Sequence, residues 1–265
     1  MAIFFDQTGR SISLDTTPSR IISLVPSQTE LLFDLGLTHE VTGITKFCIH
    51  PPGWFHTKTR VGGTKELKMN IIHQLQPDLI IANKEENVKE QIEYLENYFP
   101  VWISNVNNLN DAYEMIQQVG MITNKEEAAH EMIVQINKNF APLQTTEHKL
   151  KTAYLIWQQP YMTIGGDTFI NAMLETAGFK NIFANEKRYP EVSIEQLRTM
   201  NPELLLLSSE PFPFKQNHID ELQLQLPGTK IILADGEMFS WYGSRLLLAP
   251  AYFNNLQKQI KIIRS

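Results

Sequence analysis

The sequence is short of cysteine, of positive charge and of long apolar runs. Its one cysteine, Cys48, lies inside the chain, so it offers neither an internal disulfide nor an N-terminal lipid anchor. Lys and Arg number 23 against 29 Asp and Glu, a net charge of −6. This argues against a nucleic-acid partner, because phosphate-binding surfaces concentrate basic side chains. No stretch approaches the ~20 apolar residues of a membrane span.

The N-terminus, MAIFFDQTGR, lacks the basic and then apolar pattern of a secretory signal. We therefore expect the chain, as written, to stay in the cytoplasm, unless an export segment was removed. A nucleophile elbow (G-x-S-x-G), a zinc-hydrolase helix and a Rossmann glycine fingerprint are also missing. Two carboxylates, Glu85 and Glu210, remain as an acid–base pair for an enzyme alternative. A binding protein needs none of these motifs, so we favour binding over catalysis.

What the sequence does contain is a long helical pattern at residues 123–142. Thr123 and Asn124 are candidate N-caps, and Pro142 ends the pattern because proline cannot continue the backbone hydrogen bonds. About 18 residues at 1.5 Å each make a rod of roughly 27 Å. Apolar residues recur on one face at steps of three and four: Ala129, Met132, Ile133, Ile136 and Phe140. We interpret this helix as a connection between two lobes.

Strands alternate with helices on both sides of that rod. Short apolar runs predict strands at residues 21–25, 41–45, 79–82 and 101–104, and again at 153–157, 204–207 and 230–233. Residues 3–14 predict a hairpin, and residues 46–64 and 236–245 predict long loops. This alternation is typical of parallel sheets covered by helices on both faces.

The two halves repeat one pattern. Residues 73–86 (HQLQPDLIIANKEE) match residues 198–211 (RTMNPELLLLSSEP), with a helix, a proline, an acidic residue, an apolar strand and a glutamate at the same offset. We infer an internal duplication. The predicted fold is α/β, with two Rossmann-like lobes at residues 1–122 and 143–265 joined by the single helix. Ligands bind beyond the carboxyl ends of parallel strands, so we expect a cleft between the lobes.

Four segments carry a resemblance to a known family: RIISLVPSQTELLFDLGL, VGGTKELKMNIIHQLQPDLIIA, GGDTFINAMLETAG and EVSIEQLRTMNPELLLL. They resemble the helical-backbone (class III) solute-binding proteins of ABC importers, and the cobalamin-binding branch most. The resemblance implies a non-catalytic receptor that clamps a corrinoid between two lobes for uptake, in the periplasm or cell envelope if a signal was removed. Ferric-siderophore and haem binders are cousins of this branch.

The resemblance also implies how such a receptor docks on the membrane subunit of its importer. Importer-partnered members carry one surface glutamate on each lobe, which pairs with arginines of the transporter. The matching position in the second lobe is Glu195, but in the first lobe it is Asn70. Loss of one carboxylate removes a charged docking contact.

Aromatic side chains gather where the ligand is expected. The loop at residues 236–245 places Phe239, Trp241 and Tyr242 between glycines, and flat rings in a cleft suit a broad planar or macrocyclic ligand. The alternative is that these rings fill a local core under the last helix. Strand-end loops add further candidates, and the resemblance adds Phe47 and Tyr189. The other ligand candidates are Pro26, Ser27, Trp157, Tyr161, Glu210 and Arg245.

Cys48 and His50 suggest a metal as a second possibility. A thiolate and an imidazole two residues apart on an extended loop point the same way and can share one ion. The simpler interpretation is a buried thiol and a hydrogen-bonded histidine. The alternative functions are therefore a receptor for a ferric siderophore, haem or a transition metal, or a cytosolic sensor or enzyme that reuses the scaffold. We expect a monomer without a covalent cofactor.

Overall fold

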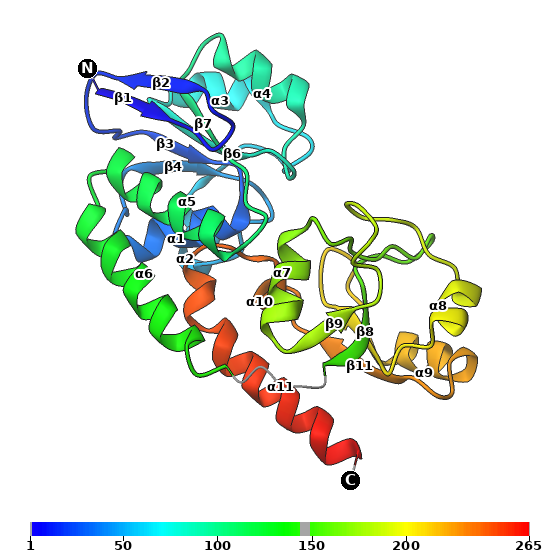
Figure 1. The fold of residues 1–265 in the computed structure, drawn as a ribbon. Helices are drawn as coiled ribbons and strands as arrows, with labels where there is room; N and C mark the ends of the chain where they lie inside the picture. Colours follow the sequence, from blue (N-terminus) through cyan, green and yellow to red (C-terminus); the bar gives the residue numbers. More distant parts are fainter. Residues whose placement is uncertain (1, 144–148, 265) are drawn as a thin grey trace. The chain divides into compact units, whose positions relative to one another are not determined.

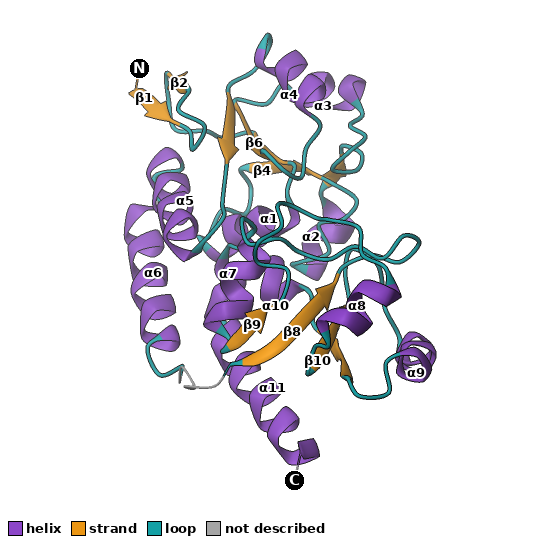
Figure 2. Cartoon of the chain, turned by 45° about the vertical axis from the view of Figure 1, so that its right-hand side comes forward, coloured by secondary structure: helices purple, strands orange, loops and turns teal. Residues whose placement is uncertain are grey.

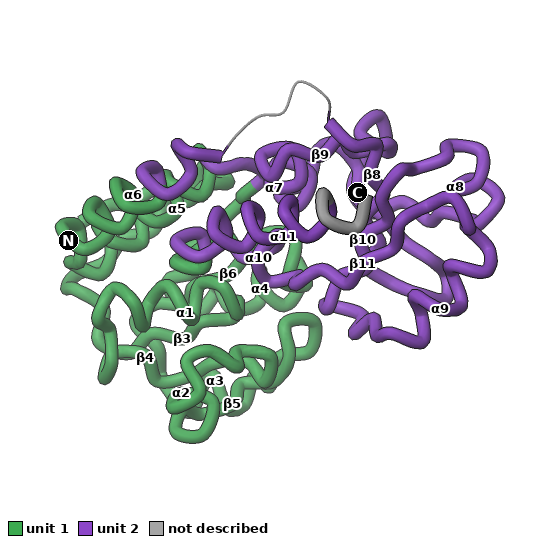
Figure 3. Tube along the Cα trace, turned by 90° about the horizontal axis from the view of Figure 1, so that it is seen from below, with its two compact units in different colours: residues 1–106, 110–136, 242–245 green, residues 107–109, 137–241, 246–265 purple. Residues whose placement is uncertain are grey.

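The computed structural model describes residues 2–143 and 149–264. The chain divides into two compact units, shown in green and purple in Figure 3. Unit 1 comprises Met1–Val106, Asn110–Ile136 and Tyr242–Arg245, and unit 2 comprises the remainder of the chain. The division thus falls inside the predicted connecting helix, and a short segment from late in the chain belongs to unit 1. The boundaries that the sequence predicts, at residues 122 and 143, remain a prediction.

Unit 1 is built on a parallel sheet of order β5-β4-β3-β6-β7. Its strands are β3 (Ile21–Ser23), β4 (Val41–Ile44), β5 (Thr59–Arg60), β6 (Leu79–Asn83) and β7 (Val101–Ser104). An antiparallel hairpin, β1 (Ala2–Phe5) and β2 (Ser11–Leu14), precedes it, as predicted. The helices are α1 (Pro26–Asp34), α2 (Pro52–Thr57), α3 (Met69–Leu75), α4 (Lys89–Glu96), α5 (Leu109–Ile122) and α6 (Glu126–Phe140). In Figures 1 and 2, α5 and α6 lie side by side.

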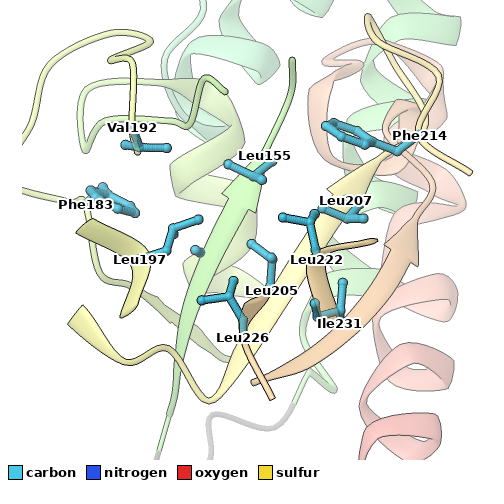
Figure 4. Packing of buried hydrophobic residues seen from close by; sticks show 11 residues of the cluster. Leu155, Phe183, Val192, Leu197, Leu205, Leu207, Phe214, Leu222, Leu226 and Ile231 are labelled. Carbon is cyan, nitrogen blue, oxygen red and sulfur yellow. The ribbon is translucent and has the colours of Figure 1, made fainter. Parts of the chain in front are cut away.

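Unit 2 has a parallel sheet of order β11-β10-β8-β9. Its strands are β8 (Leu150–Leu155), β9 (Phe179–Asn181), β10 (Leu204–Ser208) and β11 (Lys230–Ala234). Its helices are α7 (Phe169–Thr176), α8 (Ile194–Met200), α9 (Gln216–Gln225), α10 (Glu237–Ser240) and α11 (Ala249–Arg264). The 3-10 turn η1 (Ser244–Leu247) joins the last two. Figure 4 shows the core on one face of this sheet, where Leu205, Leu207 and Leu222 pack together.

The predicted fold class is confirmed, since the chain is an α/β protein with two separate parallel sheets, one in each lobe. The described strands β6 and β10 are buried at every position, as expected for strands covered on both faces. Among the described residues, no helix is both long and apolar enough to cross a membrane.

The internal repeat recurs in backbone geometry. Helices α3 and α8 each have seven residues and end at a left-handed residue, Gln76 with φ of 47° and Asn201 with φ of 46°. Pro77 and Pro202 follow and stop the helix, because proline has no N–H to donate. A buried parallel strand begins two residues later in each half.

The acidic residue after each proline has the same role in both halves. An oxygen of the Asp78 carboxylate accepts the backbone N–H of Arg20 at 2.8 Å, just before β3. An oxygen of the Glu203 carboxylate accepts the backbone N–H of Lys151 at 3.0 Å, in β8. Each acid therefore ties its strand to the start of the neighbouring parallel strand. The two sheet orders also agree, since β4-β3-β6-β7 corresponds to β9-β8-β10-β11.

Three local predictions were wrong. Thr123 and Asn124 do not cap α6, which begins at Glu126. Instead the Thr123 hydroxyl donates to the Val119 carbonyl at 2.7 Å and closes the end of α5, and Asn124 takes a left-handed φ of 57°. The predicted loops at residues 46–64 and 236–245 contain the short helices α2 and α10. Both helices are too short for a periodic apolar pattern to mark them.

Candidate functional site

The first candidate residues lie where β3 passes into α1. Pro26 is the first residue of α1, a position that suits proline because its missing N–H has no intrahelical partner there. Ser27 follows and is buried, and its hydroxyl has no hydrogen-bond partner. The buried hydroxyl of Ser244 also has none, although Ser244 comes from the distant segment of unit 1. Unpaired buried hydroxyls are uncommon, so these two set this corner apart from the rest of the described core of unit 1.

Gly243 lets that distant segment approach α1 closely. A Cβ at this position would lie 2.6 Å from the Ser27 carbonyl oxygen and 3.2 Å from the Leu31 side chain. Any other residue would push the segment away from α1. The glycine is therefore required by packing in unit 1.

Arg245 is held in unit 1 by an ion pair that the sequence did not reveal. Its Nη2 and Nε lie 2.6 Å and 3.0 Å from the two carboxylate oxygens of Glu30, on α1. Both side chains are largely buried. Burial raises the pKa of Glu30, although the Arg245 guanidinium opposes this. The charge of Arg245 is thus already matched by a carboxylate.

Tyr242 forms the other anchor of this segment. Its hydroxyl donates to the Glu86 carboxylate at 2.8 Å, and only 6% of the residue is exposed. Glu86 follows β6, so it sits at the carboxyl end of the unit 1 sheet. Sequence reasoning missed both Glu30 and Glu86 as anchors.

Cys48 is buried in unit 1 between two threonines. Its Sγ lies 3.0 Å from the hydroxyl of Thr29 and 3.2 Å from that of Thr45. Burial raises the pKa of the thiol, which disfavours the thiolate that binds metals. His50, two residues further along the chain, is half-buried. Within the part of the chain that the structure describes, no three His, Cys, Asp or Glu side chains gather as a metal site.

Glu210 lies at the carboxyl end of β10 in unit 2. One of its carboxylate oxygens accepts both the Ser240 hydroxyl at 2.6 Å and the Trp241 indole N–H at 2.9 Å. Burial raises the pKa of Glu210, and the charges of Glu237 and Asp235 add to the rise while the two hydrogen bonds oppose it. The carboxylate therefore fixes the loop that carries Trp241.

The predicted aromatic residues divide into buried and exposed rings. Phe239 is fully buried and packs 4.8 Å from Phe253 of α11 and 5.2 Å from Tyr154, so the local-core alternative describes it. Trp241 is also buried, at 6% exposure. The exposed rings are those of Phe47, at 51%, and Trp157, at 40%. Both follow the carboxyl ends of strands, β4 and β8.

Tyr161 and Tyr189 are half-buried in unit 2. Tyr161 packs against the core of that unit, and the Arg188 guanidinium lies 5.8 Å from the Tyr189 ring. Phe212 was not singled out from the sequence, yet its ring lies 5.7 Å from that of Trp157. The only available signal was its place in the strand-end loop at residues 208–214.

A groove of about 640 Å³ lies elsewhere in unit 1, along α5 and α6. Its lining residues are Asn110, Tyr113, Glu114, Gln117, Met121, Glu126, His130 and Ile133. None of the predicted ligand residues lines it. We therefore place the candidate site at the strand-end loops.

Residues 21–228 match the model of a family described as periplasmic binding protein. The chain belongs to the periplasmic binding protein family. Its members are non-catalytic binding proteins, so this chain is a solute-binding protein of ABC import.

Among curated relatives, a vitamin B12-binding protein of Vibrio campbellii is 29% identical over 71% of this chain and 70% of its own length. One from Pectobacterium atrosepticum is 24% identical over 94% and 91%. Among solved structures, a periplasmic vitamin B12-binding protein of Vibrio cholerae has a TM-score of 0.72 at 22% identity, covering 91% of this chain and 99% of that one. A periplasmic haem-binding protein of the same organism has a TM-score of 0.78 at 19% identity, covering 90% and 98%. These two structural likenesses establish the fold.

The two predicted docking positions of this periplasmic binding protein are structurally equivalent. Asn70 is the second residue of α3, and Glu195 is the second residue of α8, each six residues before the left-handed helix end. Both side chains are exposed. In α8 the Ser193 hydroxyl accepts the backbone N–H of Gln196 and completes a capping box, whereas α3 has no side-chain cap. The two helices occupy equivalent places in the two units, but they differ in the charge of the docking residue and in N-terminal capping.

Proposed function

We propose that this protein binds a cobalamin-like corrinoid and delivers it to an ABC importer of the cell envelope. The observation that carries the proposal is sequence likeness, since relatives named vitamin B12-binding proteins align with up to 94% of this chain. Solved structures of a haem-binding protein and of a possible iron-binding protein share the fold at 19% and 23% identity, and a shared fold does not define a ligand.

The chemistry of the strand-end loops supports a large ligand with apolar faces. Phe47 in unit 1 and Trp157 in unit 2 each expose a wide ring at the carboxyl end of a sheet. The Lys46 ammonium lies 5.1 Å from the centroid of the Phe47 ring, whereas among the described residues no basic side chain lies over the Trp157 ring. Arg245 is matched by Glu30, so its charge is already compensated without an anionic ligand. Acidic haem or siderophore groups gain little at this arginine.

Visible absorbance and calorimetric titration with cyanocobalamin test the proposal directly. We expect binding at micromolar concentration or tighter, and weaker binding of haem. Trp157→Ala should weaken cobalamin binding by about tenfold, equivalent to 1.4 kcal/mol, because it removes an exposed aromatic contact. Phe33→Ala serves as the control, since Phe33 is also a partly exposed aromatic residue but lies on α1 away from the strand ends. Absence of cobalamin binding, or tighter binding of haem, would refute the corrinoid proposal.

Docking on an importer is tested separately. Glu195→Gln should reduce cobalamin uptake in cells that express the cognate importer, because it removes a surface carboxylate. Asn70→Glu should increase uptake, because it supplies the carboxylate that α3 lacks. Glu127→Gln on α6 removes the same charge from another exposed helix and should leave uptake unchanged. Unchanged uptake in both α3 and α8 variants would contradict the docking proposal.

A further inference from the structure

The exposed indole of Trp157 is held in place by its backbone. The Trp157 carbonyl accepts the N–H of Met162 at 3.1 Å, and the Ile156 N–H donates to the Met162 carbonyl at 3.0 Å. These bonds close a tight turn directly after β8. The backbone from which the indole projects is therefore held in place, although 40% of Trp157 is exposed.

Phe212 reaches this indole from the neighbouring strand. Strand β10 pairs with β8 in parallel, and the backbone N–H of Phe212 donates to the Ile156 carbonyl at 3.3 Å. The two rings meet edge to face, with centroids 5.7 Å apart and planes at 70°. Such geometry is the preferred one for aromatic pairs and restricts the angle of the exposed ring.

Further rings support Phe212 from behind. Phe214 lies 4.7 Å from it, and the His218 imidazole lies 5.4 Å from it. Phe214 belongs to the buried core and lies beside Leu207 and Leu222 in Figure 4. The His218 ring is fixed because its Nδ1 accepts the Lys215 N–H at 2.8 Å. The stack runs from the core of unit 2 to the exposed indole.

No lysine or arginine side chain lies over the Trp157 or Phe212 ring in the part of the chain that the structure describes. Basic groups lie instead over the rings of Phe47, Trp54, Phe55 and Tyr189. The face of the indole thus offers an apolar surface without a basic side chain over it. It suits a flat, uncharged part of a ligand.

We propose that Phe212 positions the ligand site, because it sets the angle at which Trp157 presents its exposed face to a planar, uncharged ring of the ligand. This inference rests on the proposed function. Phe212 acts through Trp157 and is therefore a positioning residue. Tyr at position 212 preserves the ring edge, whereas Leu preserves only the apolar volume.

Titration of cyanocobalamin against variants of the full chain tests the affinity. Phe212→Leu should weaken cyanocobalamin binding by about 2- to 12-fold, the range for loss of one aromatic pair. Phe212→Tyr keeps the ring and should bind with the affinity of the wild type. In a Trp157→Ala background, Phe212→Leu should have no further effect. Phe33→Leu is a matched control, since Phe33 packs edge to face on Trp54 at 5.4 Å in unit 1. Unchanged affinity in Phe212→Leu, or an equal loss in the Trp157→Ala background, would overturn the inference.

A ligand-free measurement separates this inference from the corrinoid proposal. In protein labelled with 5-fluorotryptophan, Trp157→Phe assigns the Trp157 fluorine resonance. Phe212→Leu should shift or broaden that resonance and leave the Trp54 resonance unchanged, and Phe33→Leu should do the reverse. If wild-type protein does not bind cobalamin, the corrinoid proposal fails, and this spectrum alone decides the positioning role. An unaltered Trp157 resonance in Phe212→Leu would refute it.

Discussion

Glu30 of unit 1 and Glu210 of unit 2 are both carboxylates buried near the carboxyl ends of parallel strands, but their partners differ. Glu30 faces the guanidinium of Arg245, whereas Glu210 accepts hydrogen bonds from the neutral groups of Ser240 and Trp241. Burial raises the pKa of both. In unit 1 a full positive charge compensates the carboxylate, and in unit 2 only dipoles do.

This difference lies outside the features that the two halves share. Their frameworks still agree, with the same strand order and the same acid after the same proline. The strand-end loops share a glutamate at one offset, Glu85 and Glu210, but differ in aromatic content. Framework residues are constrained by packing, whereas residues of the strand-end loops can vary with the ligand.

The largest expected effects concern the shared framework. Ile80 in β6 and Leu205 in β10 are equivalent and fully buried. Ile80→Ala and Leu205→Ala should each lower the free energy of unfolding by about 3 kcal/mol, through lost burial and a residual cavity. Urea unfolding measures the loss, and hydrogen exchange locates it, in unit 1 for Ile80 and in unit 2 for Leu205. Very unequal losses would break the equivalence of the two cores.

The ion pair of unit 1 comes next. Arg245→Ala should lower the free energy of unfolding by about 2 kcal/mol, because it leaves the Glu30 carboxylate buried without a counter-charge. Adding Glu30→Gln should recover much of that loss. The double-mutant cycle is measured by urea unfolding at neutral pH. If the two single variants simply add, the pair is not coupled.

Removing the N-cap of α8 should lower the free energy of unfolding by less than the loss of the ion pair does. Ser193→Ala should destabilise the protein by about 1 kcal/mol, because the backbone N–H of Gln196 loses the hydroxyl that accepts it at the start of α8. Lys68→Ala in α3 is the matched control and should have almost no effect, since Lys68 makes no side-chain cap. Chemical denaturation compares the two. A similar loss from both would show that the capping box adds nothing.

The smallest expected effect is a pH dependence from Glu210. Because its pKa is raised in the folded state, the stability it contributes is full below its ordinary pKa of 4.5. That stability is lost as the pH rises through the folded pKa. Glu210→Gln keeps an oxygen for Ser240 and Trp241 and should remove this loss. The free energy of unfolding of Glu210→Gln, relative to wild type, should therefore increase as the pH rises above 4.5 and through the folded pKa of Glu210.

Glu237→Gln is the control for that titration, because it removes a neighbouring charge and leaves the Glu210 hydrogen bonds in place. It should alter the pH profile less than Glu210→Gln does. A difference between Glu210→Gln and wild type that is constant with pH would show that Glu210 does not titrate as its burial implies.

Much of the fold was predictable from local patterns. Uniform apolar strands such as β6 and β10, each bounded by proline and polar residues, indicate parallel strands without any knowledge of contacts. The start of α8 was predictable too, because Ser193 caps it. The short helices α2 and α10 escaped prediction. Thr123 was wrongly predicted as a cap of α6, because a threonine hydroxyl can serve the end of one helix as readily as the start of the next.

The candidate site was predictable by place and not by side chain. Strand-end loops were identified, but the sequence did not separate Phe239, which fills a core with Phe253, from Trp157, which stays exposed. Phe212 went unnoticed for the same reason. An aromatic ring has one local signature whether it is buried or exposed, so burial depends on which distant residues arrive beside it.

The sequence by itself determined the two α/β halves, their repeat and their family, because these follow from periodicity, proline positions and apolar runs within a few residues of each other. Only the tertiary structure decided which groups meet at the strand ends. Arg245 and Glu30 are 215 residues apart in the chain and Tyr242 and Glu86 are 156 apart. Such pairs are selected by the packing of whole elements, which no local pattern encodes.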